Sequence, residues 1–332
     1  MDRDDAGITQ SAGRLSGPRP QARRVDVHRP MNCRKLLDIT VLLGGPSSER
    51  NVSLVSGEAI ASALERLGHQ VLRADISPDN TVALDRAGID VVFIALHGQF
   101  GESGDVQALC EKHALRYTGS GVRASEIAID KDATKRVCRW AGITTPDWVI
   151  ADGRSPCDLP APPVVLKPID GGSSVDITIA ETAQDRDAAL AGLLAKYGRA
   201  MVERYVRGRE FTVGILGDQA LPVLEIVPRG KFYDLHAKYD DDAGTVYNFE
   251  HGLSERMAAS LQEAALASHR AVGCRDMSRV DFIVDGRGAA WLLEINTIPG
   301  FTSHSLLPKA AARIGIGFDE LVERIVTMAL RR

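Results

Sequence analysis

The sequence lacks the features that mark several large classes of protein. No uninterrupted apolar run approaches the roughly 20 residues that a membrane-spanning helix needs. The formal net charge is only -4, and outside the N-terminal tail lysine and arginine form no long block. Membrane-spanning and nucleic-acid-binding proteins usually show one of these features, so we expect neither a membrane nor a nucleic acid as partner.

Cysteine is scarce, and its pattern is that of a reducing compartment. The five cysteines are odd in number and lack the spacing of a metal site: Cys33, Cys110, Cys138, Cys157 and Cys274. The N-terminus also lacks the apolar centre of a signal peptide, so we expect a cytoplasmic protein. Residues 1–35 show no hydrophobic period and are expected to be a disordered tail. Alternatively, the true start codon encodes Met31 and the residues before it are not translated. A basic targeting arm is a third possibility.

The first apolar segments after the tail alternate in the order typical of a parallel α/β unit. We predict strands at 36–43, 71–75 and 90–96, with a helix after the first, and two of the strands run into polar glycine loops. Ligands bind such units at the carboxyl ends of their strands. Glu49 and His97 lie in these loops. Taken alone, Glu49 could equally cap the following helix, and His97 could be structural.

Glycine is plentiful, with 31 residues, and the run of small residues at 169–175 follows a lysine-bearing strand predicted at 164–167. Backbone N–H groups of such a loop can wrap a phosphate while Lys167 supplies positive charge. The loop is not a P-loop, because the lysine precedes the glycines, and a flexible surface loop is the alternative. One helix is predicted through Lys131 and Lys135, ending at Gly142.

The most informative stretch is a predicted hairpin with strands at 280–284 and 289–295. With a turn of two or four residues, Asp281 lies opposite Leu292, and Asp281, Glu294 and Asn296 share one face with Arg279. Two carboxylates and an amide oxygen suit Mg²⁺ carrying nucleotide phosphates, whereas an exposed polar face is the alternative.

The remaining segments supply the elements around this hairpin. The runs 200–206 and 210–216 are predicted to be a pair of strands, with Glu203 and Glu210 at either end of the turn between them. The polar run 237–244 is predicted to be a mobile lid. Helices are expected at 256–272 and 318–330.

The order of motifs resembles the D-alanine–D-alanine ligases of the ATP-grasp superfamily. The matching runs are LLGGPSSERNVSLVSG, FIALHGQFGE, YTGSGVRAS, DK, LKPIDGGSSV, EFTVGIL, FYDLHAKY, RVDFIVD and EINTIPGFTSHSLLP. The resemblance implies an α/β protein with α+β subdomains: an ATP-grasp fold preceded by a parallel α/β domain. Its expected parts are an N-terminal substrate domain (36–126), a central subdomain with the phosphate loop (127–212), and a C-terminal subdomain with lid, metal site and acceptor pocket (213–332).

The resemblance also implies an activity, namely ATP-dependent joining of two D-alanines through a D-alanyl phosphate, for peptidoglycan precursor synthesis. The implied cofactors are ATP and two Mg²⁺ ions, with Mn²⁺ as an alternative, and a homodimer is implied. The implied ATP-binding residues are Lys131, Lys167, Gly172, Glu203, Glu210 and Lys238. The implied metal ligands are Asp281, Glu294 and Asn296.

The remaining implied roles concern the amino acids and the acyl group. Glu49 corresponds to the residue that receives the first substrate's ammonium, and His97 lines that pocket. Ser173 and Tyr239 hold the lid closed with Glu49. Arg279 and the backbone N–H of Gly300 correspond to oxyanion stabilisers, while Ser305 and Leu306 belong to the acceptor pocket.

Several positions depart from the family's usual pattern. Asp176 stands where a glycine is usual, Gly171 where a larger polar residue is common, and Ser103 where aspartate is frequent; the segment 247–253 lacks a proline-alanine pair. None of these removes a residue matched to ATP, metal or oxyanion binding. A related ligase with another amino-acid or hydroxy-acid acceptor, and a nucleotide-binding pseudoenzyme, are the rival interpretations. A hydrolase is not supported, because the sequence lacks a nucleophile and base arranged near a glycine elbow.

Overall fold

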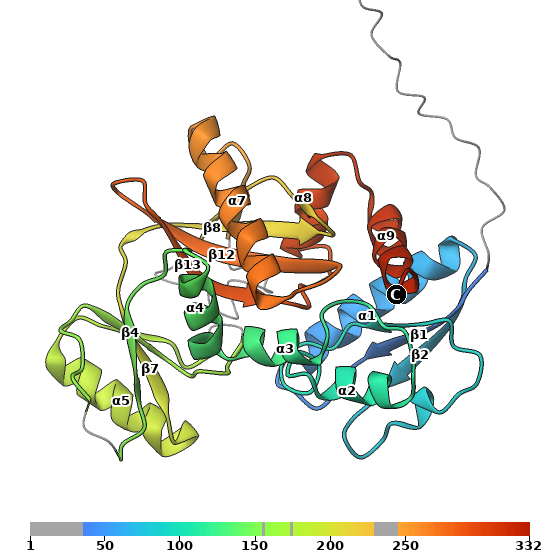
Figure 1. Ribbon diagram of the computed structural model, residues 1–332, viewed down its shortest axis with the longest axis horizontal. Helices are drawn as coiled ribbons and strands as arrows, with labels where there is room; N and C mark the ends of the chain where they lie inside the picture. Colours follow the sequence, from blue (N-terminus) through green and yellow to red (C-terminus); the bar gives the residue numbers. More distant parts are fainter. Residues whose placement is uncertain (1–35, 155–156, 173–174, 229–244) are drawn as a thin grey trace, which may run out of the picture. The chain divides into compact units, whose positions relative to one another are not determined.

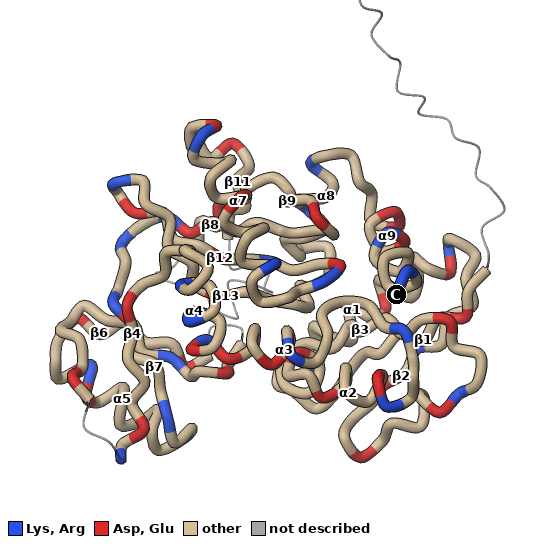
Figure 2. The backbone as a smooth tube through the Cα atoms, in the orientation of Figure 1, with Lys and Arg blue, Asp and Glu red and all other residues tan. Residues whose placement is uncertain are grey.

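The computed structural model describes residues 36–154, 157–172, 175–228 and 245–332, and their strands form three sheets (Figure 1). The predicted tail (1–35), the predicted lid (237–244), Ser173, Lys238 and Tyr239 lie outside these residues. None of the helices in the described part is both long and apolar enough to cross a membrane. Residues of both charge signs are interspersed along its elements (Figure 2).

The N-terminal sheet is parallel, as expected from the sequence, and its strand order is β2-β1-β3. Its strands are β1 (Asp38–Leu43), β2 (Gln70–Asp75) and β3 (Val91–Ile94), each close to its predicted range. The accompanying elements are α1 (Arg50–Arg66), the short 3-10 helix η1 (Val82–Leu84) and α2 (Asp105–Lys112). The carboxyl ends of β1 and β3 are therefore neighbours, which places the Glu49 and His97 loops together.

The predicted helix through Lys131 and Lys135 is two helices, α3 (Val122–Ile129) and α4 (Lys131–Trp140). Asp130 between them has an extended backbone, with φ -83° and ψ 107°, and its side chain accepts the backbone N–H of Ala133. An aspartate that caps the next helix competes with continuation of the previous one. As a consequence, Lys131 occupies the first position of a helix rather than its middle.

The predicted strand pair at 200–216 is wrong in its pairing. β7 (Ala200–Arg204) joins β4 (Trp148–Ala151), β5 (Val164–Lys167) and β6 (Thr178–Ala180) in the order β4-β7-β5-β6, covered by α5 (Ala183–Tyr197). β8 (Gly208–Leu216) instead joins the next sheet. The chain crosses between sheets at 205–207, and residue 212, where the sequence analysis divides two subdomains, lies inside β8.

The largest sheet has the order β11-β10-β8-β12-β13, with β9 paired to β8. Its other members are β9 (Gln219–Ala220), β10 (Leu224–Val227), β11 (Val246–Asn248), β12 (Met277–Asp285) and β13 (Ala290–Asn296), followed by α8 (Leu306–Arg313). α7 (Glu255–Val272) and α9 (Phe318–Leu330) match their predicted ranges closely.

Alternation along β12 decides which side chains face the site. Val280, Phe282 and Val284 are buried with Phe211 and other apolar residues of β8 in a core cluster that includes residues of α4 and α7. Because neighbouring side chains on a strand point to opposite faces, Arg279 and Asp281 must face away from that core. Burial of one face of the hairpin therefore presents its polar face to the site.

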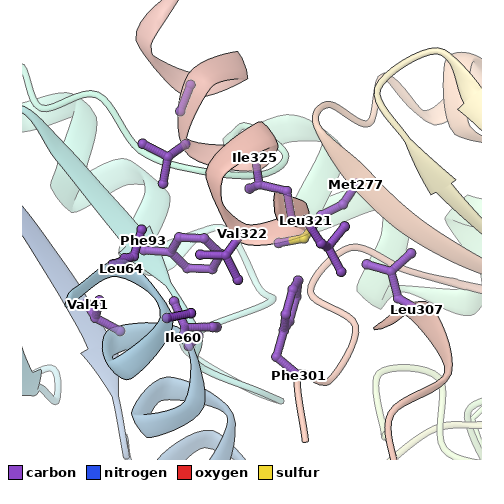
Figure 3. Close-up of a cluster of buried hydrophobic side chains, with 14 of the residues drawn as sticks. Val41, Ile60, Leu64, Phe93, Met277, Phe301, Leu307, Leu321, Val322 and Ile325 are labelled. Atoms are coloured by element: carbon purple, nitrogen blue, oxygen red, sulfur yellow. The ribbon is translucent and has the colours of Figure 1, made fainter. Parts of the chain in front are cut away.

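A second core cluster joins the N-terminal sheet to the C-terminal part of the chain. Ile60 and Leu64 of α1 pack with Leu321 and Ile325 of α9, and with Phe301 (Figure 3). The rings of Phe93 and Phe301 meet edge to face with centroids 6.0 Å apart. This packing fixes residues 300–306 against the N-terminal sheet, although they are distant in sequence.

Candidate active site

A cavity of about 440 Å³ lies where these parts meet, and most of the predicted site residues line it. Its walls come from the loops after β1 and β3, the start of α4, the glycine loop, the polar face of β12 and β13, and residues 300–306. The predicted residues that line it are Glu49, His97, Lys131, Gly172, Arg279, Glu294, Asn296, Gly300, Ser305 and Leu306.

The polar face of the hairpin is as predicted, but its register is not. Arg279 lies opposite Asn296, and Asp281 lies opposite Glu294 rather than Leu292. A β-bulge between Asp281 and Phe282 shifts the register, so that Leu293 is an extra residue on β13. Two carboxylates that the sequence placed diagonally are therefore directly opposite each other on the same face.

Asp281 is buried and held by several donors. Its Oδ1 accepts the Thr212 hydroxyl at 2.6 Å and Arg279 Nε at 3.0 Å, and its Oδ2 accepts Arg279 Nη2 at 2.8 Å. Thr212 is available because it lies opposite Asp281 on β8. Asp281 does not line the cavity itself, whereas Arg279 does. The guanidinium thus connects the buried carboxylate to the cavity wall.

Lys131 lies between the polar face of the hairpin and the glycine loop. Its Nζ is 3.3 Å from Glu294 Oε2 and donates to the Gly171 carbonyl oxygen at 2.5 Å. Its backbone N–H also donates to the Ile169 carbonyl oxygen at 2.9 Å. The start of α4 is therefore tied to the loop that the sequence predicts to bind phosphate.

Glu49 precedes α1, but its side chain makes no capping hydrogen bond, so the capping alternative is not supported. The carboxylate instead lies between two glycines. A Cβ built on either Gly98 or Gly172 would be 2.9 Å from Glu49 Oε2. These glycines leave room for the carboxylate at the edge of the cavity.

His97 is buried and fixed by three serines. Its backbone N–H donates to Ser53 Oγ at 2.8 Å, its carbonyl oxygen accepts Ser47 Oγ at 2.6 Å, and Nε2 is 3.2 Å from Ser56 Oγ. Ser56 Oγ also accepts the backbone N–H of Phe301 at 3.1 Å. The serines of the first motif therefore join the His97 loop to the segment that carries Gly300.

Glu102 is a cavity residue to which the sequence analysis gave no role. Its Oε1 is 3.6 Å from His97 Nδ1, and burial raises the pKa of its carboxyl group. The signal that could have found it is its place at the end of the glycine loop that begins with His97. Ser103 next to it does not line the cavity, because its hydroxyl accepts the Phe100 N–H and donates to Asp105.

Residues 300–306, which include the predicted acceptor-pocket residues, form another wall of the cavity. A Cβ on Gly300 would lie only 2.6 Å from Ser305 Oγ, so a larger residue there would displace the serine side chain. Ser305 Oγ in turn accepts the Thr302 N–H at 2.8 Å. Leu306 packs in an apolar cluster with Leu224 and Ile226 of β10.

Lys167, Glu203 and Glu210 are not among the cavity-lining residues. Glu203 is only 2% exposed; its Oε1 lies 3.1 Å from Lys167 Nζ and its Oε2 lies 2.5 Å from Lys135 Nζ. Burial favours the neutral acid, but Lys167 and Lys135 reverse this effect and lower the pKa of Glu203. Lys135, the second partner of Glu203, lies four residues after Lys131 and so on the same face of α4.

Two departures from the family pattern have structural counterparts. Asp176 has φ +56°, a left-handed conformation that favours glycine, and its carboxylate accepts Lys196 Nζ at 2.5 Å and the Tyr197 hydroxyl. Tyr197 lines the cavity. In the segment 247–253, the His251 carbonyl oxygen accepts Arg209 at 2.5 Å.

The donor set on the hairpin fits a hard divalent cation that also binds phosphate. Within the described ranges no cluster of three or more His, Cys, Asp and Glu side chains could hold a metal alone. The hairpin offers two carboxylates and the Asn296 amide, whose Oδ1 also accepts the Ile298 N–H at 2.9 Å. Mg²⁺ is usually held by one or two carboxylates and completed by phosphate oxygens, so this small set is sufficient.

Comparison with known proteins gives a consistent result. A family model described as D-ala D-ala ligase C-terminus matches residues 133–327. A D-alanine–D-alanine ligase of Syntrophotalea carbinolica is 45% identical over 296 residues, covering 89% of this chain and 96% of the relative. One of Aquifex aeolicus is 42% identical over 292 residues, covering 87% and 99%.

Solved structures agree with the sequence comparisons. The crystal structure of a D-alanine–D-alanine ligase from Bacillus anthracis complexed with ATP has a TM-score of 0.78 and 29% identity, covering 89% of this chain and 98% of that one. The enzyme from Coxiella burnetii gives 0.76 and 28%, covering 89% and 96%. The ATP-grasp fold expected from the motifs is thereby confirmed.

Proposed function

The chain belongs to the D-alanine–D-alanine ligase family, and we propose that the cavity between its sheets is where it joins two D-alanines. The enzyme is an ATP-dependent ligase that forms D-alanyl-D-alanine, the dipeptide of peptidoglycan precursors. The observation that carries the assignment of the site is the convergence of Glu49, Lys131, Arg279 and Glu294 on one cavity of about 440 Å³. That volume lies within the range typical of small-molecule sites.

The first D-alanine binds at the corner formed by Glu49 and His97. The Glu49 carboxylate receives the substrate's ammonium, a charge-assisted contact, and the space beside it is kept open by Gly98 and Gly172. The fixed His97 lines the same corner, and Glu102 on its other side orients the imidazole. Ser173 and Tyr239 complete this corner in our proposal.

ATP binds between the central sheet and the hairpin. Lys131, Lys167 and Lys238 neutralise its phosphates, and Gly172 brings backbone close to them. Glu203 and Glu210 lie on the adenosine side. The Glu203 carboxylate reaches the nucleotide while it remains bonded to two lysines, since each carboxylate oxygen has a second lone pair.

Asp281, Glu294 and Asn296 hold two Mg²⁺ ions, or Mn²⁺, together with the phosphates. When bound, the ions offset the phosphate charge that opposes nucleophilic attack. Glu294 and Asn296 line the cavity, and Asp281 lies directly opposite Glu294 on the neighbouring strand. Arg279 would keep Asp281 oriented for the metal through its hydrogen bonds to both carboxylate oxygens.

The reaction has two displacements. A carboxylate oxygen of the first D-alanine attacks the γ-phosphorus of ATP, which gives D-alanyl phosphate and ADP. The amine of the second D-alanine then attacks the acyl carbon, and phosphate leaves as the amine loses a proton. Arg279 and the Gly300 N–H donate to the acyl oxygen as its negative charge grows, a form of stabilisation worth about 3–4 kcal/mol per donor. Ser305 and Leu306 position the second D-alanine.

The assembly and location of the enzyme are part of the same proposal. We propose a homodimer in the cytoplasm, the compartment in which both ATP and peptidoglycan precursors are available. The three buried cysteines of the described part, Cys110, Cys138 and Cys274, are free thiols, as a reducing compartment requires.

The test is to measure ADP release by the purified protein with Mg-ATP and identify the products by mass. D-Alanine alone should give ADP and D-alanyl-D-alanine, whereas L-alanine alone should give neither. A mixed product with D-lactate or D-serine in preference to D-alanyl-D-alanine would contradict the assignment of the acceptor pocket. Nucleotide binding without turnover on any pair would contradict the ligase function.

A further inference from the structure

Lys135 is a buried cation outside the cavity to which no role has yet been given. It lies one turn after Lys131 in α4 and is 0% exposed. Its Nζ donates to Glu203 Oε2 at 2.5 Å and to Thr145 Oγ1 at 2.6 Å. The Thr145 hydroxyl in turn donates to the Leu292 carbonyl oxygen at 2.8 Å, which extends the hydrogen-bond network to β13.

Lys135 and Lys167 share one carboxylate. Glu203 gives one oxygen to each ammonium, and in the described part of the chain neither lysine makes another ion pair. Two positive side chains against one negative side chain leave one positive charge in excess. Burying an uncompensated charge is costly, so this arrangement is unfavourable for stability alone. An anion bound nearby removes the cost.

The titratable groups that face Lys135 agree with this view. Glu203 on β7 raises the pKa of its ammonium, while Lys167 on β5 and Arg139 in the same helix lower it. Burial is the largest effect, and the pKa falls to about 8. A lysine kept so close to losing its proton is not what a stable core requires.

We propose that Lys135 is a positioning residue for nucleotide binding: it occupies one oxygen of Glu203, so that the other oxygen holds the Lys167 ammonium for the phosphates. This inference rests on the proposed role of Lys167 at ATP. Without Lys135, Glu203 and Lys167 form a neutral pair, in which both carboxylate oxygens compete for the one ammonium. The nucleotide then loses both the excess positive charge and a fixed Lys167.

The test compares Lys135→Met and Lys135→Arg with Lys167→Met in the full chain, with the exposed Lys112→Met as the matched surface control. Changes behind a directly binding group typically cost about 10–100-fold in affinity, so Lys135→Met should raise KM for ATP by about that factor. KM for D-alanine should change little. Lys135→Arg keeps the charge and should restore most of the affinity for ATP.

The pH profile separates positioning from simple packing. Deprotonation of Lys135 removes one positive charge, so KM for ATP in the unmodified enzyme should rise as pH increases through about 8. Arginine stays charged, so this rise should be absent in Lys135→Arg. The pH profile needs only the unmodified enzyme and Lys135→Arg, so it tests the proposal even if Lys135→Met fails to fold. A melting curve of Lys135→Met shows whether that variant folds.

The outcomes are distinguishable. If Lys167→Met raises KM for ATP while a folded Lys135→Met does not, the positioning role is wrong and the proposed nucleotide site stands. Equal increases in KM for ATP and D-alanine in Lys135→Met, or a KM for ATP that is flat through pH 8 in the unmodified enzyme, also overturn it. If Lys167→Met leaves KM for ATP unchanged, the proposed nucleotide site itself is wrong.

Discussion

Two walls of the active-site cavity are built in different ways. The hairpin wall, with Arg279, Glu294 and Asn296, is fixed by strand pairing on both sides of β12 and by the apolar core beneath it. The opposite wall, with Glu49, Gly98 and Gly172, consists of loops that approach each other closely. In the hairpin, the pairing register of β12 and β13 positions the charged side chains. In the loops, Gly98 and Gly172 position the Glu49 carboxylate because they have no side chains to displace it.

This difference predicts how each wall responds to change. A substitution on the hairpin removes a charge but leaves the backbone in place, so the effect should fall on chemistry. A substitution in the loops adds atoms where none fit, so the effect should fall on substrate binding. The following variants test that division, starting with the largest expected effect.

Glu294→Ala should abolish turnover. It removes a carboxylate that we propose binds metal, and also the partner of Lys131. Substitutions of residues that only support a metal ligand already cost about 10–100-fold in affinity or activity. Steady-state ADP release at varied Mg²⁺ measures it. Glu320→Ala, at an exposed ion pair with Arg324 on α9, is the control and should retain activity. Normal turnover in Glu294→Ala would falsify the metal assignment.

Arg279→Met should lower kcat by about 10²–10³-fold, the loss typical of one oxyanion donor. Nucleotide affinity should change much less, because the ligands of the phosphates remain. Equilibrium binding of ATP beside single-turnover kinetics gives both quantities. If binding weakens as much as turnover, the main role of Arg279 is to hold Asp281, its partner at 2.8 Å, rather than to stabilise the acyl oxygen.

Gly172→Ala should mainly raise KM for D-alanine, by about 10-fold, since small displacements of a positioning group cost up to 100-fold. The new Cβ would be 2.9 Å from Glu49 Oε2, so the carboxylate must move. Gly192→Ala in α5 is the matched control, because a Cβ there has nothing within 4 Å. An unchanged KM for D-alanine in Gly172→Ala would show that the Glu49 carboxylate can move without loss of substrate binding. The loop wall would then not differ from the hairpin wall in the way described above.

Asp176 lies in the glycine loop but does not line the cavity, so the expected effects of changing it are small. Asp176→Gly relieves the left-handed backbone but loses the exposed contacts with Lys196 and Tyr197, so turnover should stay within about twofold of the original. Asp176→Ala loses the same contacts and keeps the strain. It should therefore melt a few degrees below Asp176→Gly by calorimetry. Equal melting temperatures would mean that the φ of +56° carries no strain.

The sequence by itself determined the elements whose signal is local. Apolar periodicity located α1, α7 and α9 and the parallel strands β1 to β3, and alternation located the polar face of the hairpin. It also placed Glu49 and His97 at strand ends, where their loops meet. These features follow from burial of one face or one stripe, which neighbouring residues already specify.

Only the tertiary structure decided how distant segments pair. The bulge that sets Asp281 opposite Glu294 depends on one extra residue, which alternation cannot count. β7 and β8 look like a hairpin in sequence but join different sheets, because each finds its partners elsewhere in the chain. Lys135 reads as an ordinary helical lysine until β7 brings Glu203 against it. Which strands pair depends on the burial and hydrogen bonding of the whole fold. A short stretch of sequence does not determine these quantities, because they involve partners elsewhere in the chain.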